Sequence, residues 1–102
     1  MTEFPEKKQV VAILQRFLGS SRARALLFGS VASGKSTSRS DIDVAIVSDQ
    51  PLDLATWAML EAEFSNSDIA RKVDLIDYQR VNASFKKVID RDGQEIWRSH
   101  LV

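Results

Sequence analysis

Hydrophobic and polar residues alternate along this chain with two different periods. In three segments apolar residues recur three and four positions apart, which places them on one side of a helix and predicts three amphipathic helices. Shorter apolar runs, bounded by glycine, proline or charged residues, are typical of buried strands. The predicted helices span residues 6–18, 54–64 and 82–92, and the predicted strands span residues 25–28, 42–47 and 72–78.

These elements follow the order α-β-β-α-β-α, which makes the fold class α/β. Residues 95–97 add either a short final strand or a tail. A chain of 102 residues has the size of one domain, so we expect residues 1–102 to form a single compact unit. In that unit a small mixed β-sheet is packed by helices.

Composition narrows the classes of partner. Fourteen basic residues balance fourteen acidic ones, and strong nonspecific binding to nucleic acid needs an excess of positive charge, so we do not expect it. No apolar run approaches the roughly 18 residues of a membrane-spanning helix, and the N-terminus does not follow the pattern of a secretory signal. The chain has no cysteine, which excludes disulfides and thiolate metal sites. We therefore expect a cytoplasmic protein without a membrane partner.

Residues 26–47, LLFGSVASGKSTSRSDIDVAIV, carry the most distinctive pattern and have two interpretations. From Gly29 the stretch matches G-x-x-x-x-G-K-S, the phosphate-binding loop of P-loop NTPases. That loop works because it leads directly into a helix whose first amides hold phosphates. Here the sequence after Lys35 returns to a strand by Ile42, which leaves no room for such a helix. A P-loop-type nucleotide binder is therefore the weaker alternative.

The same stretch also contains G-S, ten residues and then D-x-D, with a short loop or one-turn helix expected over residues 31–40. Gly29 permits a tight turn where a side chain would collide with a phosphate, and Ser30 can donate its amide and hydroxyl. Asp41 and Asp43 are two positions apart and face the same side of a strand. Their carboxylates repel each other, and a divalent cation removes that repulsion. Oxygen ligands without thiol or histidine indicate Mg²⁺ or Mn²⁺.

A third carboxylate is available on the strand predicted at residues 72–78. Asp74 and Asp77 are three positions apart, so they face opposite sides of that strand and only one can join the site. Val73 and Leu75 form the natural buried face, which leaves Asp74 on the other. We therefore predict that Asp74, rather than Asp77, completes the acidic site.

With Gly29-Ser30, ten intervening residues, Asp41-x-Asp43 and the acidic strand at residues 72–77, the chain resembles the minimal nucleotidyltransferases of the DNA polymerase β-like superfamily. The resemblance covers nearly all of the chain. It implies the polymerase-β-like nucleotidyltransferase core. It also implies a metal-dependent transfer of a nucleoside monophosphate, usually AMP from ATP, with release of pyrophosphate.

The resemblance also implies roles for individual residues. Asp41 and Asp43 would hold both metal ions, which bridge the triphosphate, and Asp74 would complete the site for the incoming nucleophile. Gly29 and Ser30 would bind oxygens of the β- and γ-phosphates. Positioning and charge neutralisation would supply most of the catalysis.

One position departs from the family pattern. The family loop often reads G-S-x-A-R-G, whereas Ser33 stands here in place of the arginine. Lys35 and Arg39 lie on the same loop and are the expected replacements for its positive charge near the phosphates. Lysine is a point charge without the bidentate fork of arginine, so we expect the departure to affect catalytic rate more than nucleotide binding.

Family members of this size often pair with a helical HEPN-domain protein in toxin–antitoxin modules, in which the nucleotidyltransferase is the antitoxin. In some systems it attaches AMP to a tyrosine of the partner. The resemblance thus implies a macromolecular acceptor and leaves two mechanisms open. Either the protein modifies a HEPN toxin, or it binds nucleotide with weak or no catalysis and acts by complex formation. A homo-oligomer is compatible with both.

Several other residues have ordinary structural interpretations. Trp57 is expected in the core, His100 in the C-terminal tail rather than in catalysis, and Tyr78 at the surface or an interface. Trp97 either packs on the last helix or anchors a partner, since tryptophan is favoured at interface hot spots. Pairs of basic residues, such as Arg71 with Lys72, are expected to be solvated surface.

Overall fold

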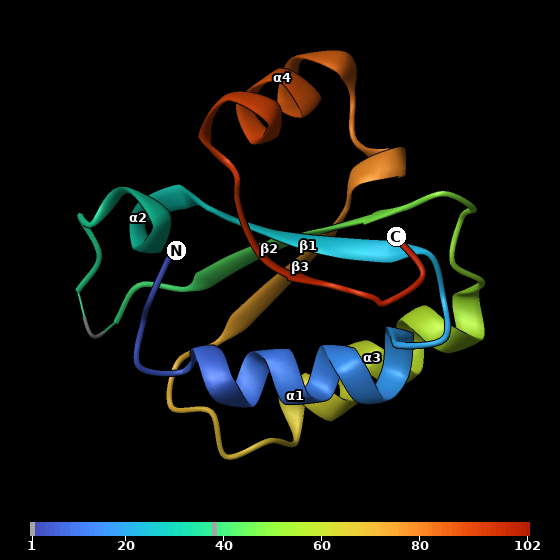
Figure 1. Cartoon of the computed structure of the whole chain (residues 1–102). Helices are drawn as coiled ribbons and strands as arrows, with labels where there is room; N and C mark the ends of the chain where they lie inside the picture. The colour runs from blue at the N-terminus through green and yellow to red at the C-terminus, as the bar shows by residue number, and fades with distance from the viewer. Residues whose placement is uncertain (1, 38) are drawn as a thin grey trace.

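A four-stranded sheet forms the centre of the molecule and carries helices on both faces, with α1 and α3 on one side and α4 on the other (Figure 1). The computed structural model describes residues 2–37 and 39–102. In chain order the elements are α1 (Lys7–Leu18), β1 (Ala23–Phe28), α2 (Gly29–Ser33), β2 (Ile42–Ser48), α3 (Leu54–Ser65), β3 (Val73–Asp77), a 3₁₀ turn η1 (Tyr78–Arg80), α4 (Ala83–Asp92) and β4 (Gln94–Arg98).

The structure confirms the α/β class, the mixed sheet and all six predicted helices and strands, with ends that differ by one or two residues. It adds β4, so residues 95–97 belong to a strand and not to a tail. It also adds α2, which begins at Gly29 itself rather than within residues 31–40. Asparagine and aspartate set the starts of two helices, because Asp53 accepts a bond from the Thr56 amide and Asn82 from the Phe85 amide.

The strand order in the sheet is β3-β2-β1-β4. β1 runs antiparallel to β2 and β4, whereas β2 and β3 are parallel. A parallel pair needs a long crossover, and here the crossover contains α3. The start of β2 therefore has a strand on each side, with Asp43 opposite Phe28 of β1 and opposite Asp74 of β3.

Two hydrophobic cores lie on the two faces of the sheet. The larger core packs α1 and α3 against the sheet and buries Val10, Ile13 and Leu14 of α1, with Phe17 half-buried at its edge. The smaller core lies under α4. Successive strand residues point to opposite faces, so neighbours in β1 and β2 divide between the two cores. The larger core includes Val10, Ile13, Leu14, Leu27, Val44 and Leu60, and the smaller consists of Leu26, Phe28, Ala45 and Ile89.

Aromatic residues join the elements to one another. Trp57 is half-buried against the larger core, as expected. Trp97 is buried, and its indole Nε1 donates a hydrogen bond of 3.0 Å to Oε1 of Gln15 on α1. The prediction that Trp97 packs on the last helix is therefore wrong. Trp97 pairs with Ala25, and both side chains belong to the larger core, on the face of the sheet opposite α4. Its burial also makes it unsuited to anchor a partner.

Tyr78 is half-buried, and its hydroxyl donates a 2.8 Å bond to Oδ1 of Asp90 on α4. His100 is exposed beyond β4. In the part of the chain that the structure describes, none of the helices has both the length and the apolar character needed to span a membrane.

Candidate functional site

Two carboxylates from different strands meet at the start of β2. The parallel register of β2 and β3 places Asp43 beside Asp74, and paired positions on neighbouring strands point to the same face of the sheet. Val73 and Leu75 pack against the larger core on the opposite face. The alternation that separates Asp74 from Asp77 is thus confirmed, while the roles of these residues remain predictions.

Asp77 has other partners. Its Oδ1 accepts a hydrogen bond of 3.1 Å from the amide of Gln79, and its Oδ2 lies 3.2 Å from Nε of Arg80. Both contacts hold the turn η1 at the end of β3, opposite Ile46 of β2 rather than Asp43. Asp77 therefore serves the local fold.

Within residues 2–37 and 39–102, no basic side chain lowers the pKa of Asp43. Its pKa is raised above the ordinary value of an aspartate, chiefly by burial and then by the negative charges of Asp74 and Asp41. Asp41 is exposed just before β2 begins. Three carboxylates close enough to disturb one another lower the stability of the ionised site, and a cation that binds them relieves that cost.

Gly29 lies directly against this acidic group. Its φ of +75° is a left-handed conformation that favours glycine, and a Cβ built on it would lie 2.2 Å from Oδ2 of Asp43. The absence of a side chain thus allows the turn from β1 into α2 to approach the Asp43 carboxylate. Ser30 follows, half-buried, in the first turn of α2.

The loop after α2 shows that the P-loop interpretation is wrong. Gly34, at φ +76°, ends α2, and the amide of Lys35 donates a 3.0 Å bond back to the carbonyl of Ser30. Residues 35–37 and 39–41 form no helix, and β2 starts at Ile42. The side chains of Lys35 and Arg39 are exposed on this loop. The hydroxyl of Ser33, which stands where arginine was expected, donates to the Ser30 carbonyl at 3.1 Å.

Arg71 is not the solvated surface residue that its sequence context suggests. Its guanidinium makes a double hydrogen bond with Glu6, with Nε donating to Oε2 at 2.7 Å and Nη2 to Oε1 at 2.6 Å. A third nitrogen, Nη1, lies 3.3 Å from the carbonyl oxygen of Thr37 in the loop before β2. No short-range pattern could reveal this arrangement, because Glu6, Thr37 and Arg71 come from three distant segments.

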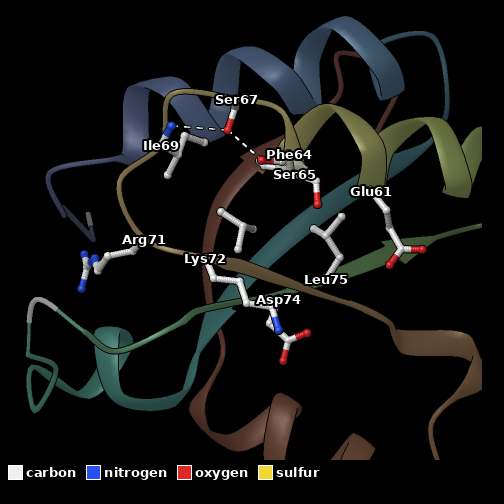
Figure 2. Close-up of a pocket in the computed structure, with 10 residues that line it drawn as sticks. Glu61, Phe64, Ser65, Ser67, Ile69, Arg71, Lys72, Asp74 and Leu75 are labelled. Atoms are coloured by element: carbon white, nitrogen blue, oxygen red, sulfur yellow. Dashed lines mark hydrogen bonds between the residues drawn. The ribbon is translucent and has the colours of Figure 1, made fainter.

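A cavity of about 400 Å³ lies between β3 and the C-terminal end of α3 (Figure 2). Polar groups line much of it, among them Glu61, Ser65 and Lys72. Asp74 also lines it, on the side away from α3 (Figure 2). An open, polar space therefore adjoins one member of the acidic pair.

The donor set suits a hard divalent cation. Asp41, Asp43 and Asp74 offer only carboxylate oxygens, the ligands that Mg²⁺ and Mn²⁺ prefer, and the like-charge repulsion at Asp43 favours ion binding. Within residues 2–37 and 39–102, no three histidine, cysteine or acidic side chains are close enough to hold an ion as they stand. The register of β2 and β3 thus brings two candidate ligands together, and the exposed Asp41 is the third candidate.

Comparison with known proteins gives this arrangement a family. The family described as "Polymerase beta, Nucleotidyltransferase" matches residues 8–100. A probable protein adenylyltransferase, MntA, of Haemophilus influenzae is 40% identical over 62 residues, which cover 61% of this chain and 54% of that protein. The chain therefore spans about half the length of that relative.

Solved structures share the fold. A toxin–antitoxin structure with AMP-PNP matches at a TM-score of 0.74 and 22% identity, covering 93% of this chain and 75% of that one. A structure of a tri-AMPylated HEPN toxin in complex with an MNT antitoxin, from Shewanella oneidensis, matches at a TM-score of 0.68 and 20% identity, covering 94% and 72%. The family match, which covers nearly the whole chain, shows that the chain belongs to the polymerase beta nucleotidyltransferase family.

Proposed function

We propose that this protein is a metal-dependent nucleotidyltransferase that transfers AMP from ATP to a HEPN-type toxin and so acts as its antitoxin. The observation that carries the proposal is the pairing of Asp43 with Asp74 across two parallel strands, against the Gly29 turn. The family match supports the reaction class. The MntA relative and the AMPylated toxin of the Shewanella complex support AMP as the transferred group and a HEPN toxin as the acceptor.

Asp41, Asp43 and Asp74 are the residues that would hold Mg²⁺ or Mn²⁺. When bound, the ion supplies positive charge that stabilises the triphosphate and the attacking oxygen during transfer. The chain itself keeps the ligands in place, because Asp43 and Asp74 belong to strands whose backbones are bonded to each other. Rigid placement of this kind lowers the reorganisation that the reaction requires.

The loop residues serve the phosphates in this proposal. Gly29 leaves room for phosphate oxygens beside Asp43, and Ser30 donates its amide and hydroxyl to them. Lys35 and Arg39 supply the positive charge that Ser33 does not. The acceptor hydroxyl attacks the α-phosphorus, the bond from that phosphorus to the bridging oxygen breaks, and pyrophosphate leaves. Asp74 positions the hydroxyl from the open side of β3 and assists the loss of its proton.

The proposal is tested by incubating the purified protein and its co-purifying partner with ATP labelled at the α-phosphate. Label on the partner, dependent on Mg²⁺ or Mn²⁺ and matched by the mass of added AMP, is the expected result. Asp74→Asn should abolish the transfer. Asp77→Asn is the matched control, since it alters the same strand on its other face and should leave transfer intact. Absence of label on the partner under all metal conditions would count against an adenylyltransferase.

A second function, antitoxin action by complex formation with little or no catalysis, is favoured by one feature. Ser33 stands where the family often has arginine, and its hydroxyl is engaged with the Ser30 carbonyl inside α2. The double variant Asp41→Ala, Asp43→Ala separates the two functions. If that variant neutralises the toxin as well as the wild type does, binding and not AMP transfer is the mechanism.

A further inference from the structure

We propose that Arg71 is a positioning residue that fixes the nucleotide loop, defined here as residues 35–37 and 39–41, through its contacts with Glu6 and Thr37. The inference deepens the proposed function, on which its meaning for nucleotide binding rests. Arg71 precedes β3 and belongs neither to the acidic site nor to the loop that it contacts. In Figure 2 its side chain reaches away from the other cavity residues, towards the N-terminal segment and the loop before β2.

The contacts of Arg71 come from two separate parts of the fold. Nε and Nη2 hold the two carboxylate oxygens of Glu6, which immediately precedes α1, at 2.7 and 2.6 Å. Nη1 donates to the carbonyl of Thr37, in the middle of the nucleotide loop, at 3.3 Å. All three guanidinium nitrogens are used, which lysine could not reproduce with a single ammonium group.

Burial separates this ion pair from the ordinary surface pairs of the molecule. The side chains of Arg71 and Glu6 are only 10% and 11% exposed. Arg22 and Asp49 form a pair of similar length, 2.9 Å, but their side chains are 63% and 62% exposed. Exposed pairs contribute little to stability and order, whereas a buried charge must be held in one geometry by its hydrogen bonds. The Arg71 side chain is therefore held in one conformation and can fix the position of a loop that it contacts.

The next residue strengthens the attachment. The carbonyl of Lys72 accepts a 2.8 Å bond from the amide of Ile42, the first residue of β2. Residues 71 and 72 thus hold the chain at Thr37 and again at Ile42, on either side of Arg39 and Asp41. Arg39 and Asp41, proposed to meet the triphosphate and the metal, therefore lie between two fixed points. The same short segment continues into Asp74, so the loop and the acid on β3 are placed together.

The experiment compares Arg71→Lys with Arg22→Lys, two identical substitutions at ion pairs of similar length and opposite burial. Backbone hydrogen exchange of the nucleotide loop is measured on the whole protein, together with the KM and kcat for ATP and the melting temperature. Arg71→Lys should increase exchange in the loop and raise KM by about tenfold or more, because small displacements of binding groups have large effects, while kcat changes less. Arg22→Lys should change none of these quantities.

The outcomes distinguish a positioning role from a purely structural one. If Arg71→Lys lowers the melting temperature but leaves loop exchange and KM equal to those of Arg22→Lys, the proposal is overturned. Should that variant not fold, Glu6→Gln gives the same comparison, because it removes one charge and leaves the guanidinium. The exchange measurement needs no activity, so it tests the Arg71 contact even if no AMP transfer is found and the proposed function fails.

Discussion

Asp43 is half-buried and Glu6 is buried, and their surroundings shift the pKa values of the two carboxyl groups in opposite directions. Around Asp43, burial and the neighbouring Asp74 and Asp41 raise the pKa. Around Glu6, the double hydrogen bond from Arg71 lowers the pKa despite burial. The negative charge of Glu6 is balanced inside the chain. Within residues 2–37 and 39–102, no basic side chain does the same for the negative charge of Asp43.

The difference indicates where the fold is optimised for stability and where it is not. A balanced buried pair holds segments together, whereas neighbouring carboxylates destabilise the ionised state unless a ligand compensates them. Sites that conflict with the surrounding structure in this way are often functional. In this protein Arg71 of the ion pair lies only three residues before Asp74 of the acidic site. The stable Glu6–Arg71 pair therefore supports the placement of the carboxylates that destabilise the ionised site.

Among the substitutions that test the contrast between Asp43 and Glu6, the largest effect on activity is expected at Asp43. Asp43→Asn keeps the shape of the side chain and removes its charge, so we expect AMP transfer to fall about 10³-fold, the equivalent of about 4 kcal/mol of metal-derived stabilisation. Stability should stay the same or rise, because the repulsion from Asp74 and Asp41 is removed. Initial rates with labelled ATP and unfolding in the presence of a chelator measure the two effects.

Glu6→Gln is the crossed control for that experiment. It is the same kind of acid-to-amide change, and it should lower stability while leaving most of kcat. If Asp43→Asn transferred AMP at the wild-type rate, or lost as much stability as Glu6→Gln, the contrast between the two carboxylates would not be functional.

Much of the candidate site could be predicted from sequence because strand geometry is local. Alternation along β3 separates Asp74 from Asp77 without knowledge of the fold, and it holds in the structure. The short stretch between Lys35 and Ile42 already argues against a P-loop helix, and residues 35–37 and 39–41 contain none. These inferences depend on neighbours within a few residues, where backbone geometry leaves few choices.

The remaining features depend on contacts between distant parts of the chain. Glu6 and Arg71 are 65 positions apart, and nothing in their local sequence distinguishes them from surface charges. Trp97 contacts Gln15 only because β4 joins the edge of the sheet beside β1. The close approach of Gly29 to Asp43 requires the pairing of β1 with β2, which a turn-forming glycine alone does not specify.

A smaller effect is expected from the charge of Glu6 and should depend on pH. At pH 7, Glu6→Gln should lower the free energy of unfolding by about 1.5–3 kcal/mol, the value of a hydrogen bond to a charged group. The folded pKa of Glu6 lies below its unfolded value of about 4.3, so this contribution is complete above that pH and disappears as the pH falls through the folded pKa. The gap between the two proteins should close in acid, as measured by denaturant unfolding at several pH values.

Glu3→Gln is the matched control for Glu6. Glu3 pairs with Lys7 at 3.2 Å, but its side chain is 72% exposed, so its replacement should change stability little at any pH. A gap between wild type and Glu6→Gln that stayed constant down to pH 3 would show that the variant loses packing rather than charge.

The smallest effect is expected when alanine replaces either of two glycines that share the same backbone φ. These two variants are also the most direct test of the contact between the Gly29 turn and Asp43. Gly29 and Gly34 have φ of +75° and +76°, and alanine in this conformation costs about 1–2 kcal/mol. A Cβ at Gly34 meets no atom within 4 Å, whereas one at Gly29 lies 2.2 Å from the Asp43 carboxylate. Gly34→Ala should therefore lose only the backbone term and keep AMP transfer, while Gly29→Ala should lose more stability and displace Asp43.

A double-mutant cycle isolates that contact. In an Asp43→Ala background the carboxylate is gone, so the stability cost of Gly29→Ala should fall to that of Gly34→Ala, measured by denaturant unfolding. An unchanged cost would mean that the Gly29 turn is constrained by its backbone alone and that Asp43 is free to move. In that case the turn does not position the acidic pair, and the pairing of β2 with β1 and β3 holds Asp43 in place instead.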